Sequence, residues 1–270
     1  MGKLRLSAYS DIKMKSRMKT ILGVICLLVL FGCDNCLAKV NILIYTKNGK
    51  GYVHDNIAVS VECLRNICTE NNWDCQVSDD ASIFTVEKIS KFDVLIFSNT
   101  NNDSFDTQQQ KDVFKAYIQG GGGFVGIHSA CGSERDWPWF WANLGGKFVR
   151  HPKFQKFDVK VIDHNNPSTV HLGEVWKWED ECYFMNQLNP DIHVLLAVDL
   201  ATIEDDGKKD YPGEVFGQYF PLCWCQEFDG GKQWYTALGH SIDHYKDANF
   251  KKHLEGGIKW VLVKDNSKTN

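Results

Sequence analysis

Three short apolar segments constrain the fold of this chain more than any other feature. They are residues 40–45 (VNILIY), 92–98 (FDVLIFS) and 124–127 (FVGI). Nearly continuous apolar runs rich in β-branched residues are typical of parallel strands buried on both faces. Asp55 opens an amphipathic helix through 57–67, and a capping box at Thr107 and Gln110 opens another that ends at glycines 120–123. Strands that alternate with helices predict an α/β fold in three layers, with a mostly parallel sheet between helices.

The second half of the chain is less regular and predicts further strands. We expect strands at 157–162 and 194–198 and a short edge strand at 75–77. Residues 222–228 and 233–238 flank Asp229-Gly230-Gly231 and predict a C-terminal β-hairpin extension of the sheet. Phe250, Leu254, Ile258 and Val261 recur at helical spacing and predict a closing helix. With no linker or repeat, residues 39–265 are expected to form one domain.

The N-terminus resembles a secretory leader. Basic residues precede an apolar run at 21–31, which is too short to span a bilayer, since a helix needs about 20 residues for that. The run ends in Leu30-Phe31-Gly32-Cys33, which resembles a bacterial lipobox. We therefore expect residues 1–38 to be a leader and Cys33 to carry a lipid that anchors an exported protein to the membrane of the cell envelope. Simple cleavage near Ala38 and an uncleaved anchor are the alternatives, and Met18 could be the true start.

Charge and cysteine content exclude other classes. Residues 1–32 hold six Lys or Arg and one Asp, so their removal moves the formal charge from −4 to −9. An acidic chain gains nothing from phosphate backbones, so nucleic acid is not expected as a partner. Ten cysteines permit disulfides in an exported protein. Their spacing matches no zinc motif, and buried free thiols are the favoured interpretation.

Three histidines follow predicted strands. His54 lies shortly after the first strand, His128 directly after 124–127, and His240 just beyond the hairpin. In parallel sheets the ligand crevice lies beyond the carboxyl ends of the strands, so we expect the three imidazoles to meet there. Imidazoles can act as general bases or bind a divalent metal such as zinc, manganese or iron. Each histidine has a simpler alternative, a turn or cap residue bonded to backbone.

Four sequence blocks resemble the ThuA-like (trehalose utilisation) family. They are GGFVGIHSA at 122–130, WYTALGH at 234–240, Tyr52-x-His54-Asp55 and Trp178-x-Asp180-Glu181-x-Tyr183, and the resemblance extends over residues 40–263. It implies the class I glutamine amidotransferase-like (flavodoxin-like) fold, in which an elbow after a strand carries a catalytic cysteine. His128 occupies that elbow position here. Cys131 lies three residues further on and is expected to pack rather than to act as a nucleophile.

The candidate site residues combine the histidines with the residues of these blocks. The expected catalytic residues are His54, His128, His240, Asp180 and Glu181, and the three histidines are also the candidate metal ligands. The expected substrate-binding residues are Lys47, Tyr52, Ser129, His151, Trp178 and Tyr183. Carboxylates beside aromatic rings can have raised pKa values and supply acid or base function. The remaining histidines, at 164, 171, 193, 244 and 253, are interpreted as surface or packing residues.

The resemblance implies an enzyme of carbohydrate metabolism that acts on a glycoside or 3-keto-glycoside, a small-molecule substrate. A ketone at C3 acidifies the C2 proton, so that a base can remove it and the C1 substituent can leave by elimination. The alternative is a non-catalytic carbohydrate-binding or assembly module on a degenerate amidotransferase-like scaffold. An active glutamine amidotransferase is not expected without the elbow cysteine. The sequence leaves open whether the protein forms a homo-oligomer.

Overall fold

The computed structural model describes residues 39–207 and 217–263. The predicted leader, 1–38, and its lipobox cysteine lie outside the described residues. Residues 40–270 separate from residues 1–39 as a compact unit of their own, and that unit contains every element described below. No helix within the described ranges has the length and apolar character needed to cross a bilayer.

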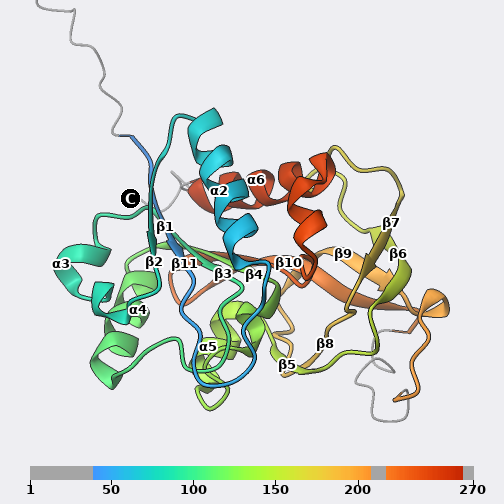
Figure 1. The fold of residues 1–270 in the computed structure, drawn as a ribbon, viewed down its shortest axis with the longest axis horizontal. Helices are drawn as coiled ribbons and strands as arrows, with labels where there is room; N and C mark the ends of the chain where they lie inside the picture. Colours follow the sequence, from blue (N-terminus) through green and yellow to red (C-terminus); the bar gives the residue numbers. More distant parts are fainter. Residues whose placement is uncertain (1–38, 208–216, 264–270) are drawn as a thin grey trace, which may run out of the picture. The chain divides into compact units, whose positions relative to one another are not determined.

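The described residues form a nine-stranded sheet, a two-stranded ribbon and helices on both sheet faces (Figure 1). The strands are β1 (Asn41–Tyr45), β2 (Asp74–Ser78), β3 (Val94–Ser98), β4 (Gly123–Ile127), β5 (Lys147–Arg150), β6 (Gln155–Val161), β7 (Val175–Asp180), β8 (Phe184–Asn186), β9 (His193–Asp199), β10 (Tyr219–Phe228) and β11 (Gly231–Thr236). The α-helices are α2 (Ile57–Glu70), α3 (Val86–Ile89), α4 (Gln108–Gln119), α5 (Pro138–Leu144) and α6 (Ala248–Leu262). Short 3-10 turns follow β4 as η2 (His128–Gly132) and precede α6 as η6 (Ile242–Lys246).

The sheet has the order β2-β1-β3-β4-β11-β10-β9-β6-β7. Its first half is parallel, as predicted, and β2 is the expected edge strand. The predicted hairpin is present as β10–β11, and it extends the parallel half of the sheet beyond β4. Strand β11 pairs in parallel with β4 and therefore lies in the middle. Trp234 and Tyr235 explain this position, because both rings are fully buried and need cover on both faces of the sheet.

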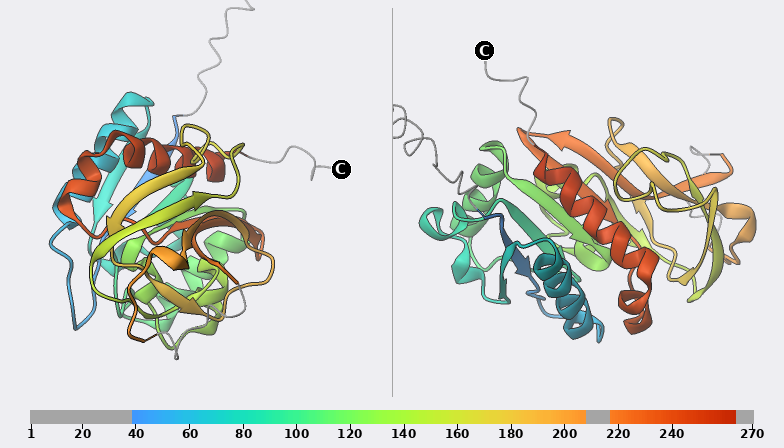
Figure 2. Two further views of the ribbon diagram at one scale, coloured as in Figure 1. Left: turned by 90° about the vertical axis from the view of Figure 1, so that its right-hand side faces the viewer. Right: turned by 90° about the horizontal axis from the view of Figure 1, so that it is seen from above.

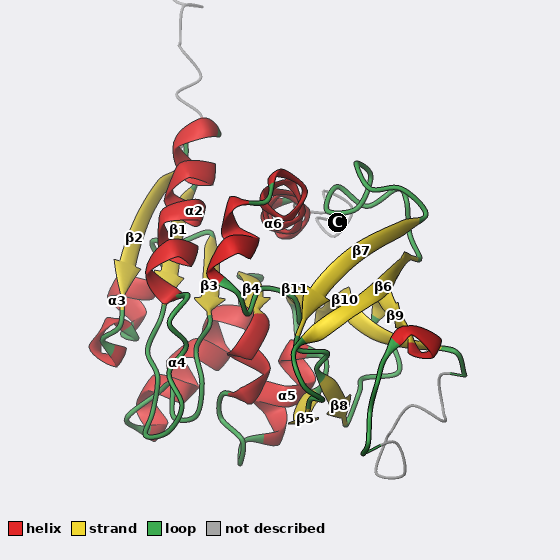
Figure 3. Ribbon diagram, turned by 45° about the vertical axis from the view of Figure 1, so that its right-hand side comes forward, coloured by secondary structure: helices red, strands yellow, loops and turns green. Residues whose placement is uncertain are grey.

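Two helix layers enclose the sheet. Helices α2 and α6 cover one face, and α4 and α5 lie on the other (Figures 2 and 3). The capping box predicted for α4 is present, with Thr107 accepting from the backbone N–H of Gln110. Phe114 of α4 packs against Phe97 of β3 and Phe124 of β4, with ring centroids 5.2 to 5.7 Å apart. These rings fix the strands whose carboxyl ends carry the site.

Strand β7 was not predicted from the sequence. Its position in the sheet determines where Asp180 and Glu181 lie. Its side chains alternate between exposed and buried, with Trp176, Trp178 and Asp180 on the buried face. The charged residues Lys177 and Glu179 interrupt the apolar ones, so the segment contains no continuous apolar run. Because β10, β9, β6 and β7 alternate in direction, β7 points the same way as β4 and β11. Its carboxyl end, at Asp180 and Glu181, thus lies at the edge where the parallel strands end.

Candidate active site

Three imidazoles and one carboxylate meet at the carboxyl ends of the strands. His128 follows β4, His240 follows β11, Glu181 follows β7, and His54 comes from the loop between β1 and α2. One ligand atom from each residue lies within 4.8 Å of the others. The ring centroid of His54 is 4.8 Å from that of His128 and 5.3 Å from that of His240. The structure thus brings together the three predicted histidines and Glu181, one of the two acidic residues predicted to be catalytic. These four residues are called the histidine cluster below.

His128 occupies a strained elbow directly after β4. Its φ of 49° lies in the left-handed region, which costs a non-glycine residue about 1–3 kcal/mol. The Nδ1 atom lies 2.8 Å from the carbonyl oxygen of Ala237, and because a carbonyl only accepts, Nδ1 carries the proton. The Nε2 lone pair therefore faces the cluster. Burial lowers the pKa of His128 well below its usual value, so the ring is neutral.

Tyr183 contacts the free nitrogen of His128. Its hydroxyl lies 2.8 Å from Nε2 and donates to it, and its ring stacks on the imidazole with centroids 4.4 Å apart. The carboxylate of Glu181 is a second acceptor near the same hydroxyl. Burial raises the pKa of Tyr183 well above its ordinary value, so the phenol remains a neutral donor. A substrate-binding residue predicted from the sequence thus lies inside the cluster.

His54 contacts Ser129 in the interior of the protein and Tyr52 at its surface. Its Nδ1 lies 3.2 Å from the hydroxyl of Ser129, which is buried. Burial, followed by the nearby charge of His240, lowers the pKa of His54 to about 4. The ring of Tyr52 meets His54 edge to face at 4.8 Å and is 62% exposed. The structure therefore places both Ser129 and Tyr52 at the site.

Glu181 is the central acceptor of the cluster. Its Oε2 lies 3.2 Å from Nδ1 of His240 and 4.0 Å from Nε2 of His128. Its other oxygen, Oε1, is 3.6 Å from Nδ1 of His151. The ring of His151 also lies 5.5 Å from that of Tyr183. His151 is therefore part of the site, on its solvent side.

Asp180 lies behind the cluster, where it positions other residues. One carboxylate oxygen accepts from the indole of Trp178 and from the backbone N–H of Gly239, and the other accepts from the N–H of Glu181. Burial raises the pKa of Asp180 to about 7. Since Asp180 and Trp178 hold the segments before His240 and Glu181, we assign them a positioning role in place of the expected acid–base and substrate-binding roles.

Asn56 is a further positioning residue that the sequence did not single out. It is fully buried at the start of α2, and its amide donates to the carbonyl oxygens of Gly239 and His240 at 2.8 and 2.7 Å. It thereby joins the loop that carries His54 to the loop that carries His240. Its only sequence signal is its place directly after the His54-Asp55 pair.

One predicted substrate-binding residue, Lys47, lies away from the histidine cluster. Lys47 forms an ion pair with Asp106, and among the described residues no hydrogen bond or ion pair joins it to the histidines. Cys131 packs as expected, with its thiol donating to the carbonyl oxygen of His128. Burial raises the pKa of Cys131 to about 12, so it is no thiolate nucleophile. Phe154 was missed, although its ring lies 5.9 Å from that of His240.

The donor set of the cluster fits a divalent transition metal. Neutral imidazoles with one carboxylate are ligands of zinc, manganese and iron. In a tetrahedral site with bonds of about 2.1 Å, donor atoms are roughly 3.4 Å apart. The atoms of His128, Glu181 and His240 are already separated by 3.2 to 4.0 Å. The backbone bond of His128 provides the outer support that orients metal-binding imidazoles.

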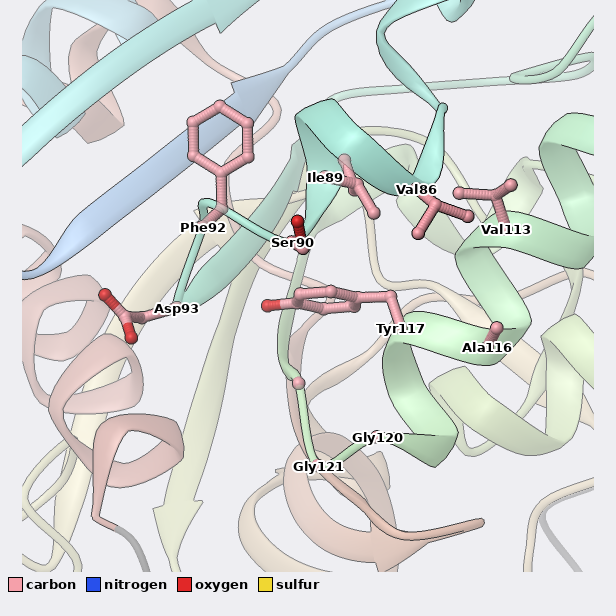
Figure 4. A pocket seen from close by; sticks show the side chains of 11 residues that line it. Val86, Ile89, Ser90, Phe92, Asp93, Val113, Ala116, Tyr117, Gly120 and Gly121 are labelled. Carbon is pink, nitrogen blue, oxygen red and sulfur yellow. The ribbon is translucent and has the colours of Figure 1, made fainter.

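A separate pocket lies at the opposite end of the sheet. It has a volume of about 390 Å³ and is lined by residues such as Phe92, Asp93 and Tyr117 (Figure 4). These residues precede β3 or end α4, so the pocket opens at the amino ends of the parallel strands. It therefore cannot deliver a ligand to the histidine cluster.

Fold and site define an α/β protein of flavodoxin-like architecture with histidine at its strand-end elbow. The chain belongs to the ThuA family, described as trehalose utilisation, whose family model matches residues 41–261. No curated protein matches the chain.

Solved structures show the same fold. A putative ThuA-like protein from Bacteroides uniformis is 24% identical, with a TM-score of 0.68 over 88% of this chain and 97% of the other. A putative ThuA-like protein from Parabacteroides merdae is 18% identical, with a TM-score of 0.65 over 83% and 90%. A β-galactosidase from Rahnella sp. R3 is 15% identical, with a TM-score of 0.53, and the match covers 82% of this chain but 31% of the enzyme.

Proposed function

We propose that this protein is a metal-assisted enzyme of trehalose utilisation that acts on a glycoside or 3-keto-glycoside. The observation that carries the proposal is the histidine cluster, in which three imidazoles and Glu181 converge within 4.8 Å at the carboxyl edge of the sheet. Family membership supplies the link to trehalose utilisation. Burial keeps His54 and His128 neutral, so each ring retains a lone pair that can coordinate a metal ion.

His54, His128, His240 and Glu181 would hold the ion. A bound divalent cation would stabilise negative charge that develops on a ketone oxygen of the substrate. The protein supplies fixed ligand orientation, because Asp180 and Asn56 hold the loops that carry the ligands.

His151 is the group best placed to move a proton. Its Nδ1 lies 2.8 Å from the carbonyl oxygen of Pro152 and donates to it, so Nε2 keeps its lone pair. Its side chain is 36% exposed, which lets substrate reach it. In this proposal Nε2 takes the C2 proton of a 3-keto-glycoside, and the C–H electron pair passes to the C3 carbonyl as an enediolate. The C3 carbonyl then re-forms, and the electron pair of the C2–C3 double bond moves to form the C1–C2 double bond. The C1–O bond breaks, and the leaving oxygen takes the proton from His151.

The test combines metal analysis with turnover. We expect close to one transition-metal ion per purified chain, release of sugar from 3-keto-trehalose, and loss of both after chelation. His128→Ala should abolish metal retention and turnover, whereas His193→Ala, which removes an exposed histidine on β9, should change neither. Metal below one tenth per chain, or no product from the keto-sugar with or without added metal, would contradict the proposal. A protein that binds sugar without turning it over would instead support the non-catalytic module.

We also propose that the protein works outside the cytoplasm, held to the membrane of the cell envelope by a lipid on Cys33. The support is the basic and apolar leader that ends in a lipobox-like Leu-Phe-Gly-Cys. Wild type should appear in the membrane fraction and Cys33→Ala in the soluble one. Equal distribution of the two forms would remove the lipid anchor from the proposal.

A further inference from the structure

Two exposed aromatic rings flank the histidine cluster. Tyr52 is 62% exposed and Phe154 is 44% exposed. All other phenylalanine, tyrosine and tryptophan side chains within the described ranges are buried or half-buried. Exposed apolar surface that gathers at one place on a protein marks a binding site more often than exposed residues that are scattered singly. Both rings lie beside the histidine cluster, and their exposure therefore indicates a binding site there.

The two rings lie at the ends of one row of aromatic side chains. Tyr52 meets His54 at 4.8 Å, His54 meets His240 at 5.3 Å, and His240 meets Phe154 at 5.9 Å, all between ring centroids. Phe154 also lies nearly parallel to the ring of His244, with 13° between the planes. Tyr52 comes from the loop between β1 and α2, and Phe154 lies directly before β6. Segments distant in sequence thus present one ring on either side of the cluster.

We propose that Tyr52 and Phe154 form the walls of a subsite for an uncharged sugar ring at the mouth of the histidine cluster. The C–H faces of a pyranose are apolar and pack well on aromatic rings, while its hydroxyls stay available for polar groups. His151 and Glu181 lie at the same mouth and offer such groups. The inference deepens the proposed function, on which it rests for the reaction, and names a neutral glycoside as the ligand that the rings recognise.

The charges beside the cluster favour a neutral ligand over a phosphorylated one. Arg150 forms two hydrogen bonds of 2.8 Å to the carboxylate of Asp205, and Lys153 lies 2.7 Å from Glu204. Both cations flank His151 in the sequence and line one hollow with it. A phosphate group there would have to compete with carboxylates that already bind these cations.

Sugar binding tests this inference separately from turnover. The probe is trehalose, titrated into the purified protein by calorimetry, with trehalose 6-phosphate as the anionic counterpart. We expect Tyr52→Ala and Phe154→Ala each to weaken trehalose binding about 5- to 10-fold, the size of one lost aromatic contact. Tyr52→Phe keeps the ring and should bind as wild type does. Val170→Ala, which shortens an apolar side chain with 63% exposure in the segment between β6 and β7, is the matched control.

The outcomes separate this inference from the proposed function. Metal content should be unchanged in both alanine variants, because neither ring supplies a ligand atom. Alanine variants with wild-type affinity, tighter binding of trehalose 6-phosphate than of trehalose, or no trehalose binding by wild type would each overturn the subsite, even if metal and turnover are found. Wild type that binds trehalose through these rings but shows neither metal nor turnover would uphold the subsite and remove the proposed reaction.

Discussion

The hydroxyl of Tyr183 competes for the nitrogen that a metal would use. It donates to Nε2 of His128 at 2.8 Å, and this lone pair is the one that points into the cluster. A hydrogen bond and a coordination bond cannot share the same lone pair. Metal binding at His128 therefore requires the Tyr183 hydroxyl to turn away, which leaves it free to donate to a substrate or to Glu181.

Removal of that hydroxyl should strengthen metal binding. Because a net hydrogen bond is worth about 0.5–1.5 kcal/mol, we expect Tyr183→Phe to bind zinc roughly 2- to 10-fold more tightly in a competition assay with a chelator. The ring, which stacks on His128, is retained. Tyr52→Phe is the matched control, since it removes a phenol oxygen at the rim. Weaker zinc binding by Tyr183→Phe would show that the hydroxyl supports the ligands and does not compete with the ion.

Among the elements, α6 depends on two glycines for its contact with the sheet. A Cβ atom at Gly257 would lie 2.4 Å from the ring of Trp234, and one at Gly256 would lie 2.2 Å from the carbonyl oxygen of Pro167. Trp234 is fully buried on β11 and its indole donates to Ser168. Glycine is unfavourable within a helix, yet here it permits the close approach that the packing of α6 on β11 requires.

We therefore expect Gly257→Ala to destabilise the protein although alanine favours helix. The gain in helix propensity is about 1 kcal/mol, whereas overpacking a buried site costs about 1–3 kcal/mol. The net loss is therefore up to about 2 kcal/mol, which for a domain of this size lowers Tm by as much as roughly 8 °C. Calorimetry measures the change, with Lys252→Ala on the exposed side of α6 as the control. An unchanged or higher Tm would mean that Trp234 yields to the added methyl group.

In the whole molecule, buried neutral histidines link stability to pH. Burial lowers the pKa of His54 and His244 to about 4 and that of His253 to about 3. The unfolded chain binds protons at these residues below a pKa of about 6.5, while the folded chain does not until the pH reaches 3 to 4. The stability they contribute is present above pH 6.5 and is lost as the pH falls. Asp180 acts in the opposite direction, because its raised pKa makes stability fall as the pH rises from about 4 to about 7.

His253 isolates this effect, because it is a buried residue of α6 that lies away from the cluster and is bonded to Ser168 and Thr236. Between pH 7 and pH 5 it should contribute about 2 kcal/mol of acid destabilisation. We expect His253→Gln to be less stable than wild type at pH 7 but to lose about 2 kcal/mol less on acidification, measured by urea unfolding with chelator present. An equal loss in the two proteins would show that His253 is protonated in the fold.

The sequence by itself determined the parallel half of the sheet and the positions of three histidines. The apolar runs at β1, β3 and β4 predict strands buried on both faces, and the family resemblance implies the elbow at His128. Such signals are local, since each depends on neighbours along the chain. The convergence of His54, His128 and His240 could be expected because parallel strands end at one edge.

Only the tertiary structure decided which acidic residue joins the histidines. Asp180 and Glu181 are neighbours in the sequence, yet strand alternation buries one behind the site and leaves the other inside it. The place of β10–β11 in the middle of the sheet, the link made by Asn56 and the exposure of Phe154 likewise depend on strand order. These features arise from contacts between residues far apart along the chain, and local sequence patterns carry no record of such contacts.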